Sequence, residues 1–183
     1  NDLEIIGDTD KTGTKVRFKA DGEIFETLEY DYERLLTRIR QQAFLNGGLS
    51  IEISDEREET VKKKKMCYEG GIREYVSYIN KNKELTHEEV IYMSGEKNGA
   101  MAEIAIQYTN RYDEMLVSFA NNIHTTEGGT HETGFKTALT RNINNYARKA
   151  GILKEKDENL KNEDVREGMT AIVSVKVEEA QFE

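Results

Sequence analysis

Asn98 and Gly99 stand between two stretches whose residues alternate as in β-strands. The pair suits the two central positions of a tight hairpin turn, because both residue types tolerate positive φ. Residues 90–94 form the first predicted strand and residues 100–108 the second, whose side chains point alternately to the two faces of a sheet. The inner face is expected to carry Ala102, Ile104, Ile106 and Tyr108. A hairpin in the middle of the chain therefore requires a fold that contains a β-sheet.

Strand and helix patterns follow one another along the rest of the chain. Apolar residues recur at helical spacing after Asp31, a good capping residue, and again before Gly151, which suits the end of a helix. The further strands are expected at 14–19, 49–53, 115–119 and 169–177, and the helices at 32–45, 72–80 and 131–150. Residues 55–65 are expected to form a solvated hairpin turn and a lysine-rich edge strand, and residues 154–167 a charged loop. This order predicts the α+β class, with α/β as the alternative. A domain boundary, and a candidate hinge, is expected at Gly70 and Gly71.

Composition narrows the class of protein. The chain has 183 residues, 37% hydrophobic and 33% charged, which is enough for one domain or for one domain and part of another. The single cysteine, Cys67, excludes an internal disulfide and a four-cysteine zinc site. No apolar run approaches the ~20 residues of a membrane span, and no signal-peptide pattern is present. We therefore expect a cytoplasmic protein without membrane contact, and a piece of something longer.

The stretch GTHETGFKT, which starts at Gly129, lies one residue away from a phosphate-binding loop, G-x-x-x-x-G-K-[ST]. Phe135 occupies the place of the lysine, and the insertion turns Lys136 by about 100° around a helix. A zinc helix, H-E-x-x-H, also fails, because Phe135 stands where the second histidine would be. Neither a nucleotide loop nor a metal site is predicted here. Thr130 is instead expected to cap the helix, with Glu132 near its positive end.

The same helix carries a cluster of cations. The chain has a formal net charge of −9, yet no acidic residue occurs between Thr133 and Ala150. The cations of this interval are Lys136, Arg141, Arg148 and Lys149, with Thr140, Asn144 and Asn145 as neutral spacers. The apolar side is expected to consist of Phe135, Leu139, Ile143, Tyr146, Ala147 and Ala150. Cations with neutral spacers favour contact with phosphates rather than bases, so we predict a surface that contacts nucleic acid.

Five stretches together resemble the B subunits of bacterial DNA gyrase. They are TDKTGTKVRFKADGEIF, AFLNGGLSIEISDER, YEGGIREYVSYINKNKE, GGTHETGFKTALTRNINNYARKAG and NEDVREGMTAIVSVKV. The resemblance covers nearly the whole chain, and the corresponding topoisomerase IV subunit is the near alternative. It implies that residues 1–70 end a nucleotide-binding domain of the gyrase, Hsp90, histidine-kinase and MutL type. Residues 71–183 would then be a transducer domain, similar to the second domain of ribosomal protein S5 and lacking its last portion.

The resemblance also implies site residues and partners. Gly13 and Thr14 match a position where a threonine hydroxyl helps to hold adenine, and Lys136 matches a position lining the opening through which DNA passes. The family's catalytic and magnesium-binding residues match nothing in this chain, so we expect no catalytic residue here and no activity of the chain alone. ATP and Mg²⁺ are expected in the full-length protein only. The implied partners are a DNA duplex, the A subunit of DNA gyrase, and a second B subunit joined through the nucleotide-binding domains.

Two other classes of function are less well supported. A non-catalytic nucleic-acid-binding module with an S5-like fold, such as an RNA binder, would need a net basic surface and exposed aromatic residues. An independent enzyme would need a nucleophile and a base at suitable spacing, and the histidines have no such partners: His87, His124 and His131.

Overall fold

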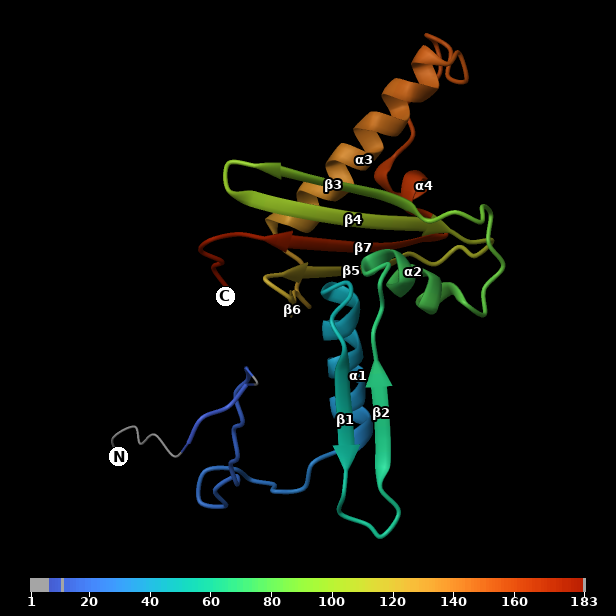
Figure 1. The fold of residues 1–183 in the computed structure, drawn as a ribbon. Coiled ribbons are helices and arrows are strands. Elements are labelled where there is room, and N and C mark those ends of the chain that lie inside the picture. The colour runs from blue at the N-terminus through green and yellow to red at the C-terminus, as the bar shows by residue number, and fades with distance from the viewer. Residues whose placement is uncertain (1–6, 11, 183) are drawn as a thin grey trace.

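A five-stranded sheet with helices on both faces forms the larger part of the molecule, and a helix with a two-stranded hairpin extends below it (Figure 1). The structure, a computed structural model, describes residues 7–10 and 12–182. Its elements are α1 (Tyr32–Leu45), β1 (Ile51–Asp55), β2 (Lys62–Met66), α2 (Ile72–Asn80), β3 (Ile91–Lys97), β4 (Ala100–Tyr108), β5 (Met115–Ala120), β6 (Ile123–His124), α3 (Thr130–Lys149), α4 (Asn162–Arg166) and β7 (Met169–Lys176).

The order of strands in the large sheet is β3-β4-β7-β5-β6. The predicted hairpin is confirmed: β3 and β4 are antiparallel, and Asn98 and Gly99 turn between them with φ of 53° and 77°. β7 pairs antiparallel with β4 and parallel with β5, so the last strand of the chain lies in the middle of the sheet. Its first six residues, 169–174, are all buried, as a central strand requires.

Alternating residues of the central strands supply two cores. One face packs on α2 through Val76, Ala105, Phe119 and Ile172. The other face packs on α3 through Ile106, Phe135, Met169, Ala171 and Val173. Because successive side chains of a strand point to opposite faces, β4 and β7 each contribute buried residues to both cores. The sheet is therefore a rigid layer between α2 and α3 (Figure 1).

α1 joins the hairpin to the large sheet. Asp31 caps the helix as predicted, accepting a hydrogen bond from the Arg34 backbone N–H at 3.0 Å. At the other end Phe44 is buried among residues of α2 and the sheet, and its ring stacks between those of Tyr68 and Tyr75, with centroid separations of 3.6 Å and 4.6 Å. The boundary expected at Gly70 therefore crosses a shared core rather than a gap between two cores. The assignment of residues 1–70 and 71–183 to two domains stays a prediction.

The expected strand at residues 14–19 is wrong. These residues form no strand, and Val16 and Phe18 are 79% and 77% exposed. A strand needs a neighbour for its backbone hydrogen bonds, and no described strand lies beside this segment. The alternating pattern is therefore present without the partner that would turn it into a sheet.

Two short elements were not predicted. β6 has two residues and pairs with the end of β5. α4 lies within the expected charged loop, where the Asp164 carboxylate accepts the Lys161 backbone N–H at 2.7 Å and Val165 is buried. Both elements are too short to produce a periodic pattern in the sequence.

Candidate nucleic-acid interface on helix α3

α3 begins at a sharp turn built by glycines. Gly128 has φ of 80°, a value that L side chains rarely adopt. Gly129 takes the capping position and has no side chain to cap with, so the predicted cap at Thr130 is wrong. Thr130 is instead the first helical residue, and Glu132 lies in the first turn as predicted.

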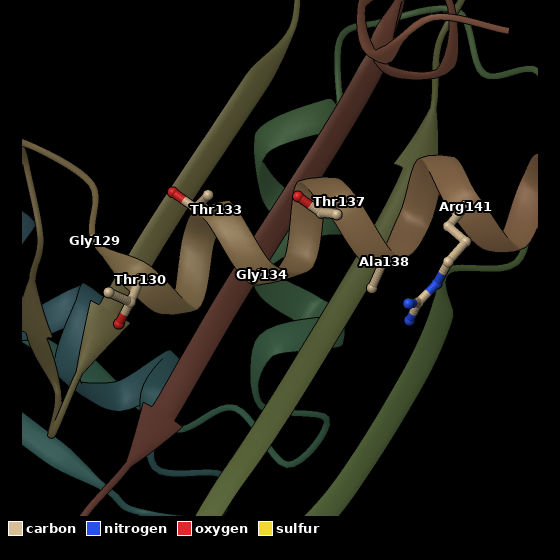
Figure 2. A pocket seen from close by; sticks show the side chains of 7 residues that line it. All are labelled: Gly129, Thr130, Thr133, Gly134, Thr137, Ala138 and Arg141. Atoms are coloured by element: carbon tan, nitrogen blue, oxygen red, sulfur yellow. The ribbon is translucent and has the colours of Figure 1, made fainter.

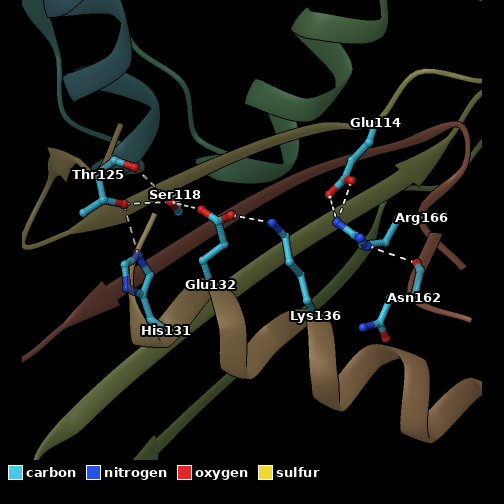
Figure 3. A network of polar contacts seen from close by, with 8 residues as sticks. All are labelled: Glu114, Ser118, Thr125, His131, Glu132, Lys136, Asn162 and Arg166. Atoms are coloured by element: carbon cyan, nitrogen blue, oxygen red, sulfur yellow. Dashed lines mark hydrogen bonds and ion pairs between the residues drawn. The ribbon is translucent and has the colours of Figure 1, made fainter. Parts of the chain in front are cut away.

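A chain of polar contacts ties this first turn to the sheet (Figure 3). Lys136 Nζ donates to Glu132 Oε1 at 2.6 Å, and Ser118 Oγ on β5 donates to Glu132 Oε2 at 2.8 Å. Ser118 Oγ also lies 2.7 Å from Thr125 Oγ1, which is 3.2 Å from His131 Nε2. Ser118 is buried, so Glu132 is attached to the framework and is not a freely moving surface acid.

Counting protons along this chain fixes the direction of each hydrogen bond. An ionised carboxylate only accepts, and a hydroxyl has one proton to donate. Ser118 gives its proton to Glu132, so the hydroxyl of Thr125 must donate to Ser118. Thr125 then has no proton left, and His131 must donate from Nε2. The network therefore requires the tautomer of His131 that carries a proton on Nε2.

The surroundings shift the pKa of both titratable partners. Burial disfavours the charged form of Glu132, but the hydrogen bonds from Lys136 and Ser118 outweigh it and hold the pKa below its ordinary value. Burial lowers the pKa of His131, and the neighbouring carboxylate of Glu132 offsets this only in part. At neutral pH the site therefore contains an anionic Glu132 beside a neutral imidazole.

The structure divides the predicted cations into three kinds. Lys136, whose side chain is 30% exposed, is paired with Glu132. Arg148 donates to Asn159 Oδ1 and to the backbone oxygens of Lys154 and Asp157, at 2.7 to 3.0 Å. Arg141 and Lys149 are exposed and have no hydrogen bond or ion pair with any described residue. Of the four, these last two can meet a partner without first giving up a contact to the described part of the chain.

The cations do not share one side of α3. Residues 136 and 141 are five positions apart, which places them roughly 140° apart around the helix. Arg141 instead lies at one end of a shallow depression along the outer side of α3, whose other lining residues are small (Figure 2): Gly129, Thr130, Thr133, Gly134, Thr137 and Ala138. This depression therefore combines small side chains with one free guanidinium.

The buried side of α3 also differs from the prediction. Tyr146 is 69% exposed, although its spacing from Phe135 and Leu139 suggested burial. Asn144 is buried, and its side chain exchanges hydrogen bonds with the backbone of Leu160 at 2.8 Å and 3.0 Å. The second half of the helix extends past the sheet and is covered by the segment that follows it (Figure 1). That segment approaches from another side, so the buried side of α3 changes along its length.

Gly13 and Thr14 belong to residues 12–20, which have no regular secondary structure. Both residues are exposed, so the residues present do not by themselves enclose a nucleotide. Within residues 7–10 and 12–182, no three His, Cys, Asp or Glu side chains are grouped so that they could hold a metal ion. In the same ranges, no helix is long and apolar enough to cross a membrane.

Residues 71–183 match the family model for DNA gyrase B. The chain belongs to the DNA gyrase B family. Among curated gyrase B subunits, that of Bacillus mycoides is 56% identical over 183 residues, which is 100% of this chain and 45% of that protein. The one from Clostridium acetobutylicum is 57% identical over 182 residues, 99% of this chain and 28% of that protein. The chain thus spans less than half the length of these gyrase B relatives.

Solved structures of gyrase B share the fold. The 43K ATPase domain of Thermus thermophilus gyrase B, solved in complex with an aminocoumarin, superposes with a TM-score of 0.78 at 34% identity and covers 89% of this chain and 44% of that one. The gyrase B subunit of Myxococcus xanthus superposes with a TM-score of 0.72 at 26% identity, and the match covers 86% of this chain and 43% of that one. A topoisomerase IV ATP-binding domain of Francisella tularensis superposes with a TM-score of 0.69 at 21% identity, and the match covers 88% of this chain and 42% of that one. At this identity the likeness shows the fold alone. The mixed α+β fold expected from the resemblance to gyrase B is therefore confirmed.

Sequence reasoning missed the anionic half of the α3 site. The acid-free interval was counted from Thr133, one residue after Glu132, although an acid four residues before a lysine is the usual spacing of a helical ion pair. The contribution of Ser118 had no signal, because nothing in its strand shows which helix covers it. The assignments of Gly13, Thr14 and the cations of α3 as gyrase B ligand contacts stay predictions.

Proposed function

We propose that this chain is part of the B subunit of DNA gyrase, an ATP-dependent type II topoisomerase, and that it couples nucleotide state to passage of a DNA duplex. The family membership supports the enzyme class, and the identity to curated gyrase B subunits favours gyrase over topoisomerase IV. ATP and Mg²⁺ would be bound largely by residues outside this chain, with Thr14 offering one hydroxyl. The expected partners are DNA, the gyrase A subunit and a second B subunit, in the cytoplasm. The chain alone is expected to be inactive.

The observation that carries the DNA contact is a pair of cations on α3, Arg141 and Lys149, which have no partner among the described residues of a chain of net charge −9. Eight positions separate them, about 12 Å along the helix axis. Successive phosphates of one DNA strand rise about 3.4 Å along the duplex axis, so the pair can reach phosphates that are not immediate neighbours. The sheet behind α3 provides a rigid body that would move as a unit with the nucleotide-binding part.

The test uses the holoenzyme, in which the complete B subunit is combined with its gyrase partner. Arg141→Gln and Lys149→Gln are each expected to raise the DNA concentration that half-stimulates ATP hydrolysis. The logarithmic salt dependence of DNA binding should become shallower by about 0.9 for each phosphate that is no longer bound. Lys64→Gln is the matched control, since it removes one exposed positive charge from β2 in the hairpin, far from α3. Equal salt slopes in all these proteins would contradict the proposed contact.

An RNA-binding module remains the rival from a different class. The overall acidity of the chain makes general affinity for RNA unfavourable. Retention on duplex DNA and on structured RNA, compared across a salt series, separates the two functions. Stronger retention on RNA at every salt concentration would favour the rival.

A further inference from the structure

Glu132 neutralises the charge of Lys136, the residue that the resemblance to gyrase B places at the opening through which DNA passes. Its Oε1 accepts from Lys136 at 2.6 Å, and its side chain is only 18% exposed. Its Oε2 is held at 2.8 Å by Ser118, a buried residue of β5. Most exposed ion pairs are loose because both side chains are mobile. This one is different, because one partner is attached to the sheet.

A phosphate that approaches Lys136 must therefore compete with a carboxylate that is already in place. We propose that Glu132 is an internal counter-ion which keeps Lys136 neutralised, so that DNA binds this lysine only by displacing the carboxylate. The inference rests on the proposed function, since it assumes that Lys136 meets DNA. It adds a residue that sets how tightly, and at what salt concentration, the site takes a duplex.

The competition follows from the geometry of the pair. The ammonium of lysine is a compact point charge, so a phosphate that approaches it closely also approaches the carboxylate of Glu132, and the two like charges repel each other. Ser118 and Lys136 approach different oxygens of Glu132, so the carboxylate keeps one strong hydrogen bond when the lysine leaves. That remaining bond lowers the cost of separating the pair. Glu132 can thus release the lysine without becoming an unsatisfied buried charge.

The proposal is tested in the same holoenzyme, with linear duplex DNA as the probe. Glu132→Gln keeps the shape of the side chain and removes its charge. We expect the DNA concentration that half-stimulates ATP hydrolysis to fall by about two- to fivefold, the range that corresponds to a partly exposed ion pair. The salt concentration at which the DNA dissociates should rise with it.

Two comparisons separate the counter-ion from simpler explanations. Glu127→Gln removes an exposed negative charge from the loop that precedes α3 and makes no contact with Lys136, so it should leave the DNA response unchanged. The double variant Glu132→Gln with Lys136→Gln should bind DNA no better than Lys136→Gln alone, because the gain exists only through the lysine. An equal gain with and without Lys136 would mean that Glu132 merely repels DNA, and would overturn the proposal.

The same set distinguishes the failure of this inference from the failure of the proposed function. If Lys136→Gln by itself leaves DNA stimulation and its salt dependence unchanged, Lys136 does not bind DNA and the counter-ion is rejected, while the contact proposed for Arg141 and Lys149 is still decided by its own variants. If Lys136→Gln weakens the response and Glu132→Gln does not strengthen it, only the counter-ion is rejected.

Discussion

Arg148 is a cation of α3 whose hydrogen bonds stabilise the fold of its own chain. Its guanidinium donates to Asn159 and to the backbone oxygens of Lys154 and Asp157, and so holds the segment that follows α3 against the helix. Arg141, which lies two turns earlier on α3, makes no comparable contact with a described residue. Residue type alone could not separate the two, because both occur in the same acid-free interval.

Arg148→Gln is expected to lower the free energy of unfolding by about 1–2 kcal/mol, since the replaced hydrogen bonds involve a charged donor at an exposed site. The residues between 154 and 159 should also become more sensitive to proteases. Arg141→Gln, the matched removal of one guanidinium, should change stability by no more than about 0.5 kcal/mol. Urea unfolding of both variants measures the difference, and equal midpoints would show that the hydrogen bonds of Arg148 contribute nothing.

His131 and Glu132 predict how stability depends on pH. The native pKa of His131 lies below its ordinary 6.5, so the unfolded chain takes up the proton first, and stability falls as the pH drops below 6.5. The native pKa of Glu132 lies below its ordinary 4.5, so its stabilising contribution is complete above 4.5 and is lost as the pH falls through the lower native value. Acidification therefore weakens the fold in two successive ranges.

His131→Gln should flatten the upper range, and Glu132→Gln should flatten the lower one. Urea midpoints measured in steps of pH for the parent and both variants report each range separately. An unchanged slope in the upper range for His131→Gln would assign that dependence to another group.

Among the elements, α1 has a role in the core of the large sheet that its sequence pattern does not indicate. The sequence predicts a helix with a cap at Asp31, and that helix is present. What the pattern could not reveal is that its last turn enters the core of the large sheet, where Phe44 is 1% exposed between Tyr68 and Tyr75. A hinge at Gly70 and Gly71 would have to move this aromatic stack, so the junction is stiffer than two glycines suggest.

Phe44→Ala should lower the free energy of unfolding by about 3–5 kcal/mol, as for other large-to-small changes in a core. The control is Phe18→Ala, which removes the same side chain from a site that is 77% exposed and should cost about 0.5 kcal/mol or less. Urea unfolding should remain a single transition in both. Equal costs would mean that the stack does not hold α1 to the sheet.

The other elements show why some predictions succeed. β4 has the predicted bounds, because a β-strand pattern and an adjacent Asn-Gly turn act together on the same residues. Residues 14–19 alternate as well, but a strand is completed only by a neighbour that the pattern does not name. On α3 the periodicity located the helix correctly and then misassigned Asn144 and Tyr146, since the covering segment changes along its length.

At the scale of the whole molecule, the cluster of cations predicted from the sequence of α3 proves to consist of residues with different surroundings. Counting charges along the chain found the right helix, but it could not distinguish a free cation from one engaged by a carboxylate or a loop. Lys136, Arg148 and the pair formed by Arg141 and Lys149 have different surroundings and therefore different availability to a polyanion. The structure narrows the DNA-facing prediction from four equivalent residues to two free ones and one restrained one.

Because β7 lies between β4 and β5, the large sheet can be completed only after the last strand has been synthesised. β4 and β5 have no hydrogen-bonding partner on their facing sides until residues 169–176 arrive between them. While the ribosome is still making the preceding loop, the nascent chain must hold two open strand edges and the exposed apolar side chains beside them. A chain released early, before Met169, would keep those edges permanently, and unpaired edges invite association with other chains. Truncation just upstream of β7 should therefore yield an aggregating product rather than a smaller folded one.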